Sequence, residues 1–175
     1  MMTTSSTLDA STVATAVGPL TLITDPGGAL RAAGFTADPD DLLAVVHPDL
    51  RGPVRRRADL GDVTRAVRSY LAGDFTAIDR LPVCQHGGPY QHTAWSALRE
   101  VKPGEPVSYT AFALRSGRPA AVRAAAGACA RNAVALVVPC HRVLRGDGTL
   151  GGYRWGLPIK KWLLDHESQV TFAGR

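Results

Sequence analysis

Apolar and polar residues along the first part of the chain follow a pattern that predicts strands. Residues 13–23 alternate and are rich in β-branched side chains, and a second apolar run covers residues 30–35. Residues 25–28, Asp-Pro-Gly-Gly, have the composition of a turn, so the two runs predict a β-hairpin. Acidic residues open the segment 38–46, and a proline follows it, which predicts a short helix. The arginine-rich residues 51–57 predict a loop.

The spacing becomes helical at residues 62–71, where apolar side chains recur every three or four positions before a glycine. Residues 80–83 predict one more strand. A Gly-Gly-Pro break then interrupts the chain, and we take it as a boundary. The pattern therefore predicts an N-terminal α/β domain, residues 1–86, and a mostly α-helical domain, residues 87–175.

Helical periodicity dominates the second domain. Residues 90–101 predict one helix, and Ser108 is a good N-cap for a short helix over residues 109–115. A Gly-Arg-Pro turn separates that helix from a second one over residues 120–131. Two short helices joined by a glycine-containing turn are typical of a helix-turn-helix.

The second of these helices consists almost entirely of alanine, with Arg123 as its one long projecting side chain near the start. It offers few groups that could read base edges in a major groove. Its small side chains would instead allow a nucleic-acid surface to approach the helix backbone closely. Tight packing of a strong helix former explains the same composition equally well.

An unbroken apolar run, residues 133–138, ends at Pro139 and is followed at once by Cys140, His141 and Arg142. Such a run predicts a short strand buried on both faces. A cysteine is nucleophilic as the thiolate, which a neighbouring base or cation favours, and His141 and Arg142 are both candidates for that role. A half-buried structural thiol is the alternative, because free cysteines are often buried.

Residues 145–156 form a glycine-rich loop without the Lys-Ser/Thr ending of a phosphate-binding loop. Residues 158–167 predict a final helix, with a proline in its first turn and Trp162 and Leu163 on its core face. From its position at the end of that helix, Glu167 is predicted to be a solvated surface residue.

The chain has 175 residues, of which 45% are hydrophobic, enough to build a real core. Its three cysteines lack zinc-site spacing, so we expect reduced thiols and no metal. No apolar segment is long enough to span a bilayer, and the start lacks signal-peptide features, which predicts a cytoplasmic protein. Residues 1–86 carry 8 basic and 10 acidic side chains, whereas residues 87–175 carry 12 and 5. A polyanion would therefore dock on the second domain.

Several short motifs occur in a fixed order in this second domain. They are Ser108-Tyr109, Gly117-Arg118-Pro119, Ala121-Val122-Arg123-Ala124, Asn132, Pro139-Cys140-His141-Arg142-Val143, Gly152-Tyr153 and Trp162-Leu163-Leu164. Together they resemble the O(6)-alkylguanine-DNA alkyltransferase family. The resemblance is strong over residues 87–168 and only outlined over residues 13–86. The loop over residues 145–156 is most similar to that of the C-terminal module of the bacterial protein Ada.

The resemblance implies direct reversal of DNA damage, in which Cys140 irreversibly accepts an alkyl group from O(6) of guanine, or from O(4)-methylthymine, in duplex DNA. It implies that His141 takes the thiol proton through a water molecule and that Glu167 polarises the histidine. This role contradicts the surface position predicted above for Glu167. Asn132 would connect the helix-turn-helix to the strand that carries the cysteine.

The same resemblance implies that the target base is flipped out of the stack and that Arg123 fills the vacated space. The helix of small residues would enter the minor groove, which suits repair without sequence preference. Contacts to the DNA would come from Tyr90, Tyr109, Thr110 and Arg118, and the walls of the guanine pocket from Val143, Tyr153, Arg154 and Trp155.

The family fold implied is a small ribonuclease-H-like α/β domain followed by a helical domain with the helix-turn-helix. The expected protein is a monomer that needs no cofactor and no protein partner, binds no membrane, and acts on double-stranded DNA that carries O(6)-alkylguanine. Two other classes remain open from the residues. A non-catalytic helix-turn-helix module would bind DNA without modifying Cys140, and a cysteine hydrolase would turn over repeatedly.

Overall fold

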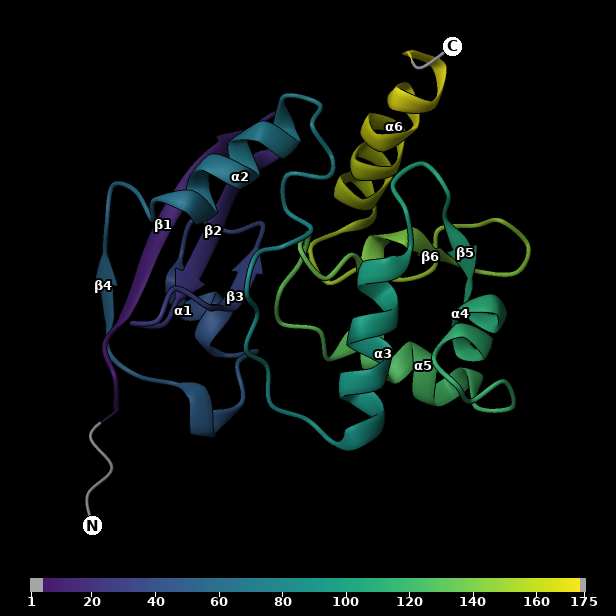
Figure 1. The fold of residues 1–175 in the computed structure, drawn as a ribbon, viewed down its shortest axis with the longest axis horizontal. Helices are drawn as coiled ribbons and strands as arrows, with labels where there is room; N and C mark the ends of the chain where they lie inside the picture. The colour runs from purple at the N-terminus through teal and green to yellow at the C-terminus, as the bar shows by residue number, and fades with distance from the viewer. Residues whose placement is uncertain (1–4, 174–175) are drawn as a thin grey trace. The chain divides into compact units, whose positions relative to one another are not determined.

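A computed structural model describes residues 5–173 of the chain, which form two compact units that divide between His86 and Gly87 (Figure 1). Each unit has its own secondary structure and its own buried residues. No helix among the residues described is long and apolar enough to cross a membrane.

The N-terminal unit is built on a four-stranded mixed sheet with the order β3-β2-β1-β4. The first three strands are antiparallel neighbours, and β4 pairs with β1 in parallel. Apolar residues of β1, β2 and β3 supply much of the buried core of this unit. The strands are β1 (Leu8–Thr15), β2 (Gly18–Thr24), β3 (Leu30–Gly34) and β4 (Val54–Arg56).

The hairpin predicted around residues 25–28 is confirmed as β2 and β3, but three details of the sheet differ from the prediction. Residues 13–23 are not one strand, because the chain reverses at Gly18, whose φ of 108° suits glycine. The predicted loop over residues 51–57 contains the edge strand β4. Residues 80–83 contribute only an isolated bridge from Val83 to Leu30. Strand pairing of such short segments depends on distant partners rather than local sequence.

The helices of this unit are α1 (Pro39–Leu43), the 3-10 helix η1 (Pro48–Leu50) and α2 (Asp62–Leu71). Asp38 caps α1 by accepting a hydrogen bond from the backbone N–H of Asp40, which confirms the predicted start. That helix is shorter than predicted, whereas α2 matches its predicted range. Val63, Val67 and Tyr70 form the buried face of α2.

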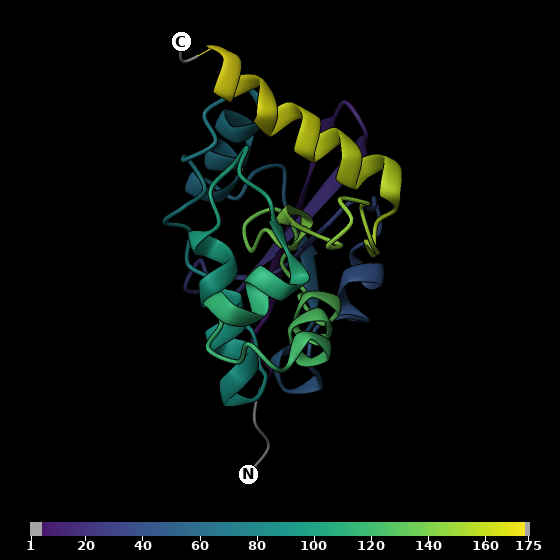
Figure 2. The same cartoon turned by 90° about the vertical axis from the view of Figure 1, so that its right-hand side faces the viewer.

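The C-terminal unit consists mainly of helices, as predicted. The side chain of Ser108 accepts a hydrogen bond from the N–H of Ala111, so the N-cap predicted there is confirmed. Figure 2 shows α4 and α5 beside one another and α6 as a long separate helix. The helices are α3 (Pro89–Glu100), α4 (Tyr109–Arg115), α5 (Val122–Ala130), the 3-10 helix η2 (Cys140–Arg142) and α6 (Leu157–Ala173), and a parallel pair is formed by β5 (Val107–Ser108) and β6 (Val143–Leu144).

The apolar run over residues 133–138 is buried, as predicted, but the prediction of a strand there is wrong. The segment is a series of turns, and Leu136 has a positive φ of 71°. The side chain of Asn132 organises it by accepting a bond from the N–H of Val134 and donating to the carbonyl of Val138. A side-chain amide therefore satisfies backbone groups that a strand would pair with a neighbour.

Candidate active site

Cys140 is the first residue of η2 and opens onto a pocket of about 340 Å³ in the C-terminal unit. The wall of this pocket is formed by α4, α5, the turns after Asn132 and the loop that precedes α6. Its volume is typical of a site for a small molecule or a single base. The lining residues are Tyr109, Ala126, Cys129, Ala130, Asn132, Ala135, Cys140, Gly152, Tyr153, Arg154 and Trp155.

Behind the cysteine, a buried network joins η2 to α6. Nε2 of His141 lies 3.0 Å from Oε2 of Glu167. Arg142 donates to both carboxylate oxygens of Glu167, from Nε at 2.9 Å and from Nη2 at 2.8 Å. It also donates from Nη1 to the carbonyl of Val101 at 2.7 Å. Glu167 is 0% exposed, so its predicted surface position is wrong.

The network fixes the charge of each member. Burial alone would raise the pKa of Glu167, but the charges and hydrogen bonds of His141 and Arg142 outweigh it and hold that pKa well below its usual range. Burial lowers the pKa of His141 despite the attraction of Glu167. At neutral pH, therefore, a carboxylate paired with the Arg142 guanidinium faces a neutral imidazole.

Burial raises the pKa of the Cys140 thiol, and a hydrogen bond with Asn132 and the positive charge of Lys160 partly offset it. Arg142, predicted as a candidate cation for this thiol, instead points its guanidinium at Glu167. The resting cysteine is thus a thiol that needs a base, and Nδ1 of His141 has no hydrogen-bond partner among the residues described. This nitrogen is free to take up a proton.

Lys160 is a site residue that the sequence pattern did not single out. Although it is a lysine, it is 0% exposed. Its Nζ donates to the carbonyls of Val143 at 2.8 Å and Gly152 at 3.2 Å, and also to that of Leu150. It thereby holds the glycine-rich loop against β6. Its spacing of three and seven residues from Leu163 and Glu167 put it on the buried helix face, a signal that the sequence contained.

The residues expected to contact DNA lie on or near α3, α4 and α5. Tyr109 is half-buried and lines the pocket, whereas the side chains of Thr110, Arg118 and Arg123 are exposed. Tyr90 is half-buried. Its hydroxyl shares a 2.8 Å hydrogen bond with Ser116, and the Arg118 guanidinium lies 4.6 Å from the centre of its ring.

Three of the four residues predicted for the pocket wall line the cavity beside Cys140, and the fourth does not. Tyr153, Arg154 and Trp155 line the pocket, and the Arg154 guanidinium bonds to the carbonyl of Ala130. The hydroxyl of Tyr153 is buried without a hydrogen-bond partner among the residues described. Val143 does not line the pocket, because it lies fully buried in β6, where it pairs with Val107.

The geometry defines a pocket that presents a cysteine beside two short helices, and comparison with known proteins identifies the family of the chain. Residues 89–169 match the family model described as the DNA-binding domain of 6-O-methylguanine DNA methyltransferase. The methylated-DNA–protein-cysteine methyltransferase of Shigella flexneri is 37% identical over 161 residues, which cover 90% of this chain and 94% of that protein. The chain belongs to the methylated-DNA–protein-cysteine methyltransferase family.

Other relatives agree in sequence and in fold. The bifunctional transcriptional activator and DNA repair enzyme Ada of Escherichia coli is 52% identical over 89 residues, which cover 51% of this chain and 25% of Ada. The crystal structure of Mycobacterium tuberculosis OGT in complex with DNA superposes with a TM-score of 0.75 at 28% identity. That match covers 92% of this chain and 93% of the other.

Proposed function

We propose that this protein repairs DNA by transferring an alkyl group, chiefly methyl, from O(6) of guanine in duplex DNA to Sγ of Cys140. O(4)-methylthymine is a second substrate. The observation that carries the proposal is the position of Cys140, which faces a base-sized pocket while the buried His141, Arg142 and Glu167 network lies directly behind it. Membership of the methyltransferase family supports the same reaction.

The chemistry follows from the charge states of the network. Neutral His141 takes the proton of the Cys140 thiol through a water molecule, and Glu167 stabilises the imidazolium that forms. The thiolate then attacks the alkyl carbon as the bond from that carbon to O(6) breaks. The oxygen keeps the electron pair, so the base leaves as the guanine anion, and a thioether remains on the protein. The anion takes up one proton to restore guanine, and His141 gives up the proton that it took from the thiol. A thioether is chemically stable, so each molecule reacts once.

The Tyr153 hydroxyl suits the second half of this reaction. Guanine gains negative charge as the bond to O(6) breaks, and a hydrogen-bond donor aimed at the base stabilises that charge. The hydroxyl is buried in the pocket region and has no partner among the residues described, so a bound base would satisfy it. Burial also raises the pKa of Tyr153 far above its usual value, which keeps the proton available for donation.

The DNA side of the proposal rests on the C-terminal unit. Helices α4 and α5 act as a helix-turn-helix in which α5, rich in small residues, enters the minor groove. Arg123 occupies the space left by the flipped base, and Tyr109 contacts the flipped nucleotide. Tyr90, Thr110 and Arg118 bind the DNA backbone. The protein acts as a monomer. Its N-terminal unit is a ribonuclease-H-like domain, and none of its described residues lines the pocket.

Stoichiometry tests the proposal. The protein is titrated with duplex DNA that contains one O(6)-methylguanine, and intact mass and peptide mapping follow the protein. We expect one methyl group per chain, located on the peptide that contains Cys140, and one repaired guanine per protein molecule. Repeated turnover would indicate a hydrolase. Binding of the duplex without an adduct would indicate a non-catalytic helix-turn-helix module.

Replacing Arg123 with alanine should slow repair in duplex DNA by roughly 10- to 100-fold, because a flipped base then returns to the stack more readily. The reaction with free O(6)-methylguanine base should change little, since that base needs no flipping. Both rates are measured by single-turnover kinetics. Arg65→Ala, which removes an exposed arginine of α2, is the matched control. Equal slowing with both substrates would assign Arg123 to the chemistry or to folding.

Trp155 should restrict the pocket to small alkyl groups, because its indole lines the space beside Cys140. We expect O(6)-benzylguanine to react poorly and methylated DNA to react readily. Trp155→Gly should reduce the ratio of the methyl-transfer rate to the benzyl-transfer rate by roughly 10- to 200-fold. This is the usual effect of one steric clash of about 1–3 kcal/mol. Trp155→Phe, which retains an aromatic ring, should reduce this ratio much less. A wild-type protein that consumes benzylguanine as fast as Trp155→Gly would show that this loop does not set the pocket size.

A further inference from the structure

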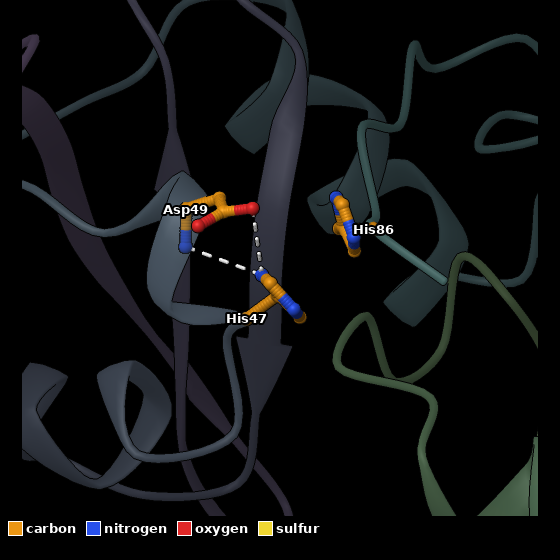
Figure 3. A group of neighbouring side chains, drawn as sticks. All are labelled: His47, Asp49 and His86. Atoms are coloured by element: carbon orange, nitrogen blue, oxygen red, sulfur yellow. Dashed lines mark hydrogen bonds and ion pairs between the residues drawn. The ribbon is translucent and has the colours of Figure 1, made fainter. Parts of the chain in front are cut away.

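A cluster of metal-ligating side chains lies in the N-terminal unit, outside the alkyl-transfer site. It consists of His47, Asp49 and His86, and each offers one ligand atom within 4.8 Å of the other two (Figure 3). All three residues are exposed, and none has a role in the proposed reaction.

The contact between His47 and Asp49 places two electron-rich atoms against each other. The backbone N–H of Asp49 donates to Nδ1 of His47 at 3.2 Å, so this nitrogen presents a lone pair. Oδ2 of Asp49 lies 3.6 Å from the same nitrogen. No hydrogen atom can bridge this nitrogen and the carboxylate in that tautomer. A cation between the two atoms would turn a repulsive contact into an attractive one.

The third ligand comes from a distant part of the chain. The rings of His47 and His86 stack with their centres 3.8 Å apart and an interplanar angle of 24°. Figure 3 shows the His86 ring facing the other two side chains across a short gap. One imidazole nitrogen of His86 lies within 4.8 Å of the ligand atoms of His47 and Asp49.

The backbone on both sides of the cluster is held in place. Pro48 opens η1 directly after His47, and Arg31 donates from Nη1 to the carbonyl of Leu50 at the end of η1. On the other side, the N–H of Cys84 donates to the carbonyl of Leu30 at 2.8 Å. The fold thus brings residues that are far apart in sequence together, with their ligand atoms within 4.8 Å of one another.

We propose that His47, Asp49 and His86 bind a divalent transition-metal ion of the zinc type, with water completing the coordination. Two imidazoles and one carboxylate suit zinc, whereas magnesium and calcium prefer all-oxygen sites. In a tetrahedral zinc site, neighbouring ligand atoms are about 3.4 Å apart, given metal–ligand distances of about 2.1 Å. The 3.6 Å separation of His47 and Asp49 is close to this value. Bound metal would tie η1 to the end of the N-terminal unit.

Titration of the full-length protein tests this proposal. Isothermal titration with zinc chloride should show one site. His47→Ala, His86→Ala and Asp49→Asn should each lower the affinity for zinc by about 10- to 100-fold. His92→Ala, which removes an exposed histidine of α3, should leave the affinity unchanged. All four variants should still accept one methyl group on Cys140, so failure of the metal site can be distinguished from failure of the proposed function.

Cobalt(II) distinguishes this site from the cysteines, because thiolate ligands give an intense charge-transfer band that imidazole and carboxylate ligands do not. We expect a cobalt spectrum without that band, unchanged in Cys84→Ser and lost in His86→Ala. Three results would overturn the proposal: no saturable binding, a thiolate band, or an affinity that the His47 and His86 variants leave unchanged. The last of these would leave His47, Asp49 and His86 as a surface cluster that binds no metal.

Discussion

Cys140→Ala is expected to abolish alkyl transfer completely, whereas Cys129→Ala should retain most of it. Both thiols line the same pocket, so position alone does not decide which one reacts. Burial raises the pKa of both, but only Cys140 has the hydrogen bond with Asn132 that favours the thiolate, and only Cys140 directly precedes His141. A thiol without a base beside it stays protonated and unreactive near neutral pH.

The measurement is the methyl adduct per chain after incubation with methylated duplex DNA. Cys84→Ala, which removes a thiol of the N-terminal unit, is the control and should behave like the wild type. An adduct that persists in Cys140→Ala, or that disappears in Cys129→Ala although the protein remains folded and binds DNA, would assign the acceptor role to Cys129.

Glu167→Ala should destabilise the protein by about 3–5 kcal/mol, because it leaves the buried Arg142 guanidinium without a counter-ion. Methyl transfer by the molecules that remain folded should also slow sharply, since His141 loses the carboxylate that stabilises its protonated form. Urea unfolding and single-turnover kinetics measure the two effects. Asp165→Ala is the matched control, because Asp165 lies on the same helix in an exposed pair with Lys161 and should change stability by less than about 0.5 kcal/mol.

Glu167→Gln separates the role of Glu167 in stability from its role in methyl transfer. The amide keeps the shape of the carboxylate and one hydrogen-bond acceptor for Arg142, so it should destabilise less than alanine, while methyl transfer should slow by a similar factor. If Glu167→Gln reacts as fast as the wild type, the carboxylate serves folding and not the activation of His141.

The same network gives stability a defined pH dependence. The pKa of Glu167 is lower in the folded protein than its unfolded value of about 4.3, so its stabilisation is present above that pH and is lost as the pH falls. The pKa of His141 is also lowered, so below about pH 6.5 the unfolded chain takes up a proton more readily. Both groups therefore lower the free energy of unfolding of the wild type as the pH falls. In Glu167→Gln, the part of this decrease that comes from Glu167 should be absent.

Local sequence determined those features that depend on neighbours along the chain. The helical spacing of residues 62–71 and the N-cap at Ser108 predicted α2 and α4 with their observed bounds. The turn over residues 25–28 predicted the hairpin of β2 and β3. The motif at Cys140 and His141, together with the resemblance of its surroundings to a family, was enough to indicate the chemistry. These features depend on backbone geometry and side-chain type over a few residues.

Tertiary structure decided what depends on distant partners. Residues 133–138 have the apolar content of a strand, but the buried amide of Asn132 satisfies their backbone and folds them into turns. The sequence placed Glu167 at the end of its helix and so favoured exposure, yet α6 continues to Ala173. An ion pair with Arg142 and a hydrogen bond with His141, both from η2, offset the cost of burying Glu167. Lys160 is buried because three backbone carbonyls compensate its ammonium group. A charge can be buried only where partners satisfy it, and the fold alone determines which residues those partners are.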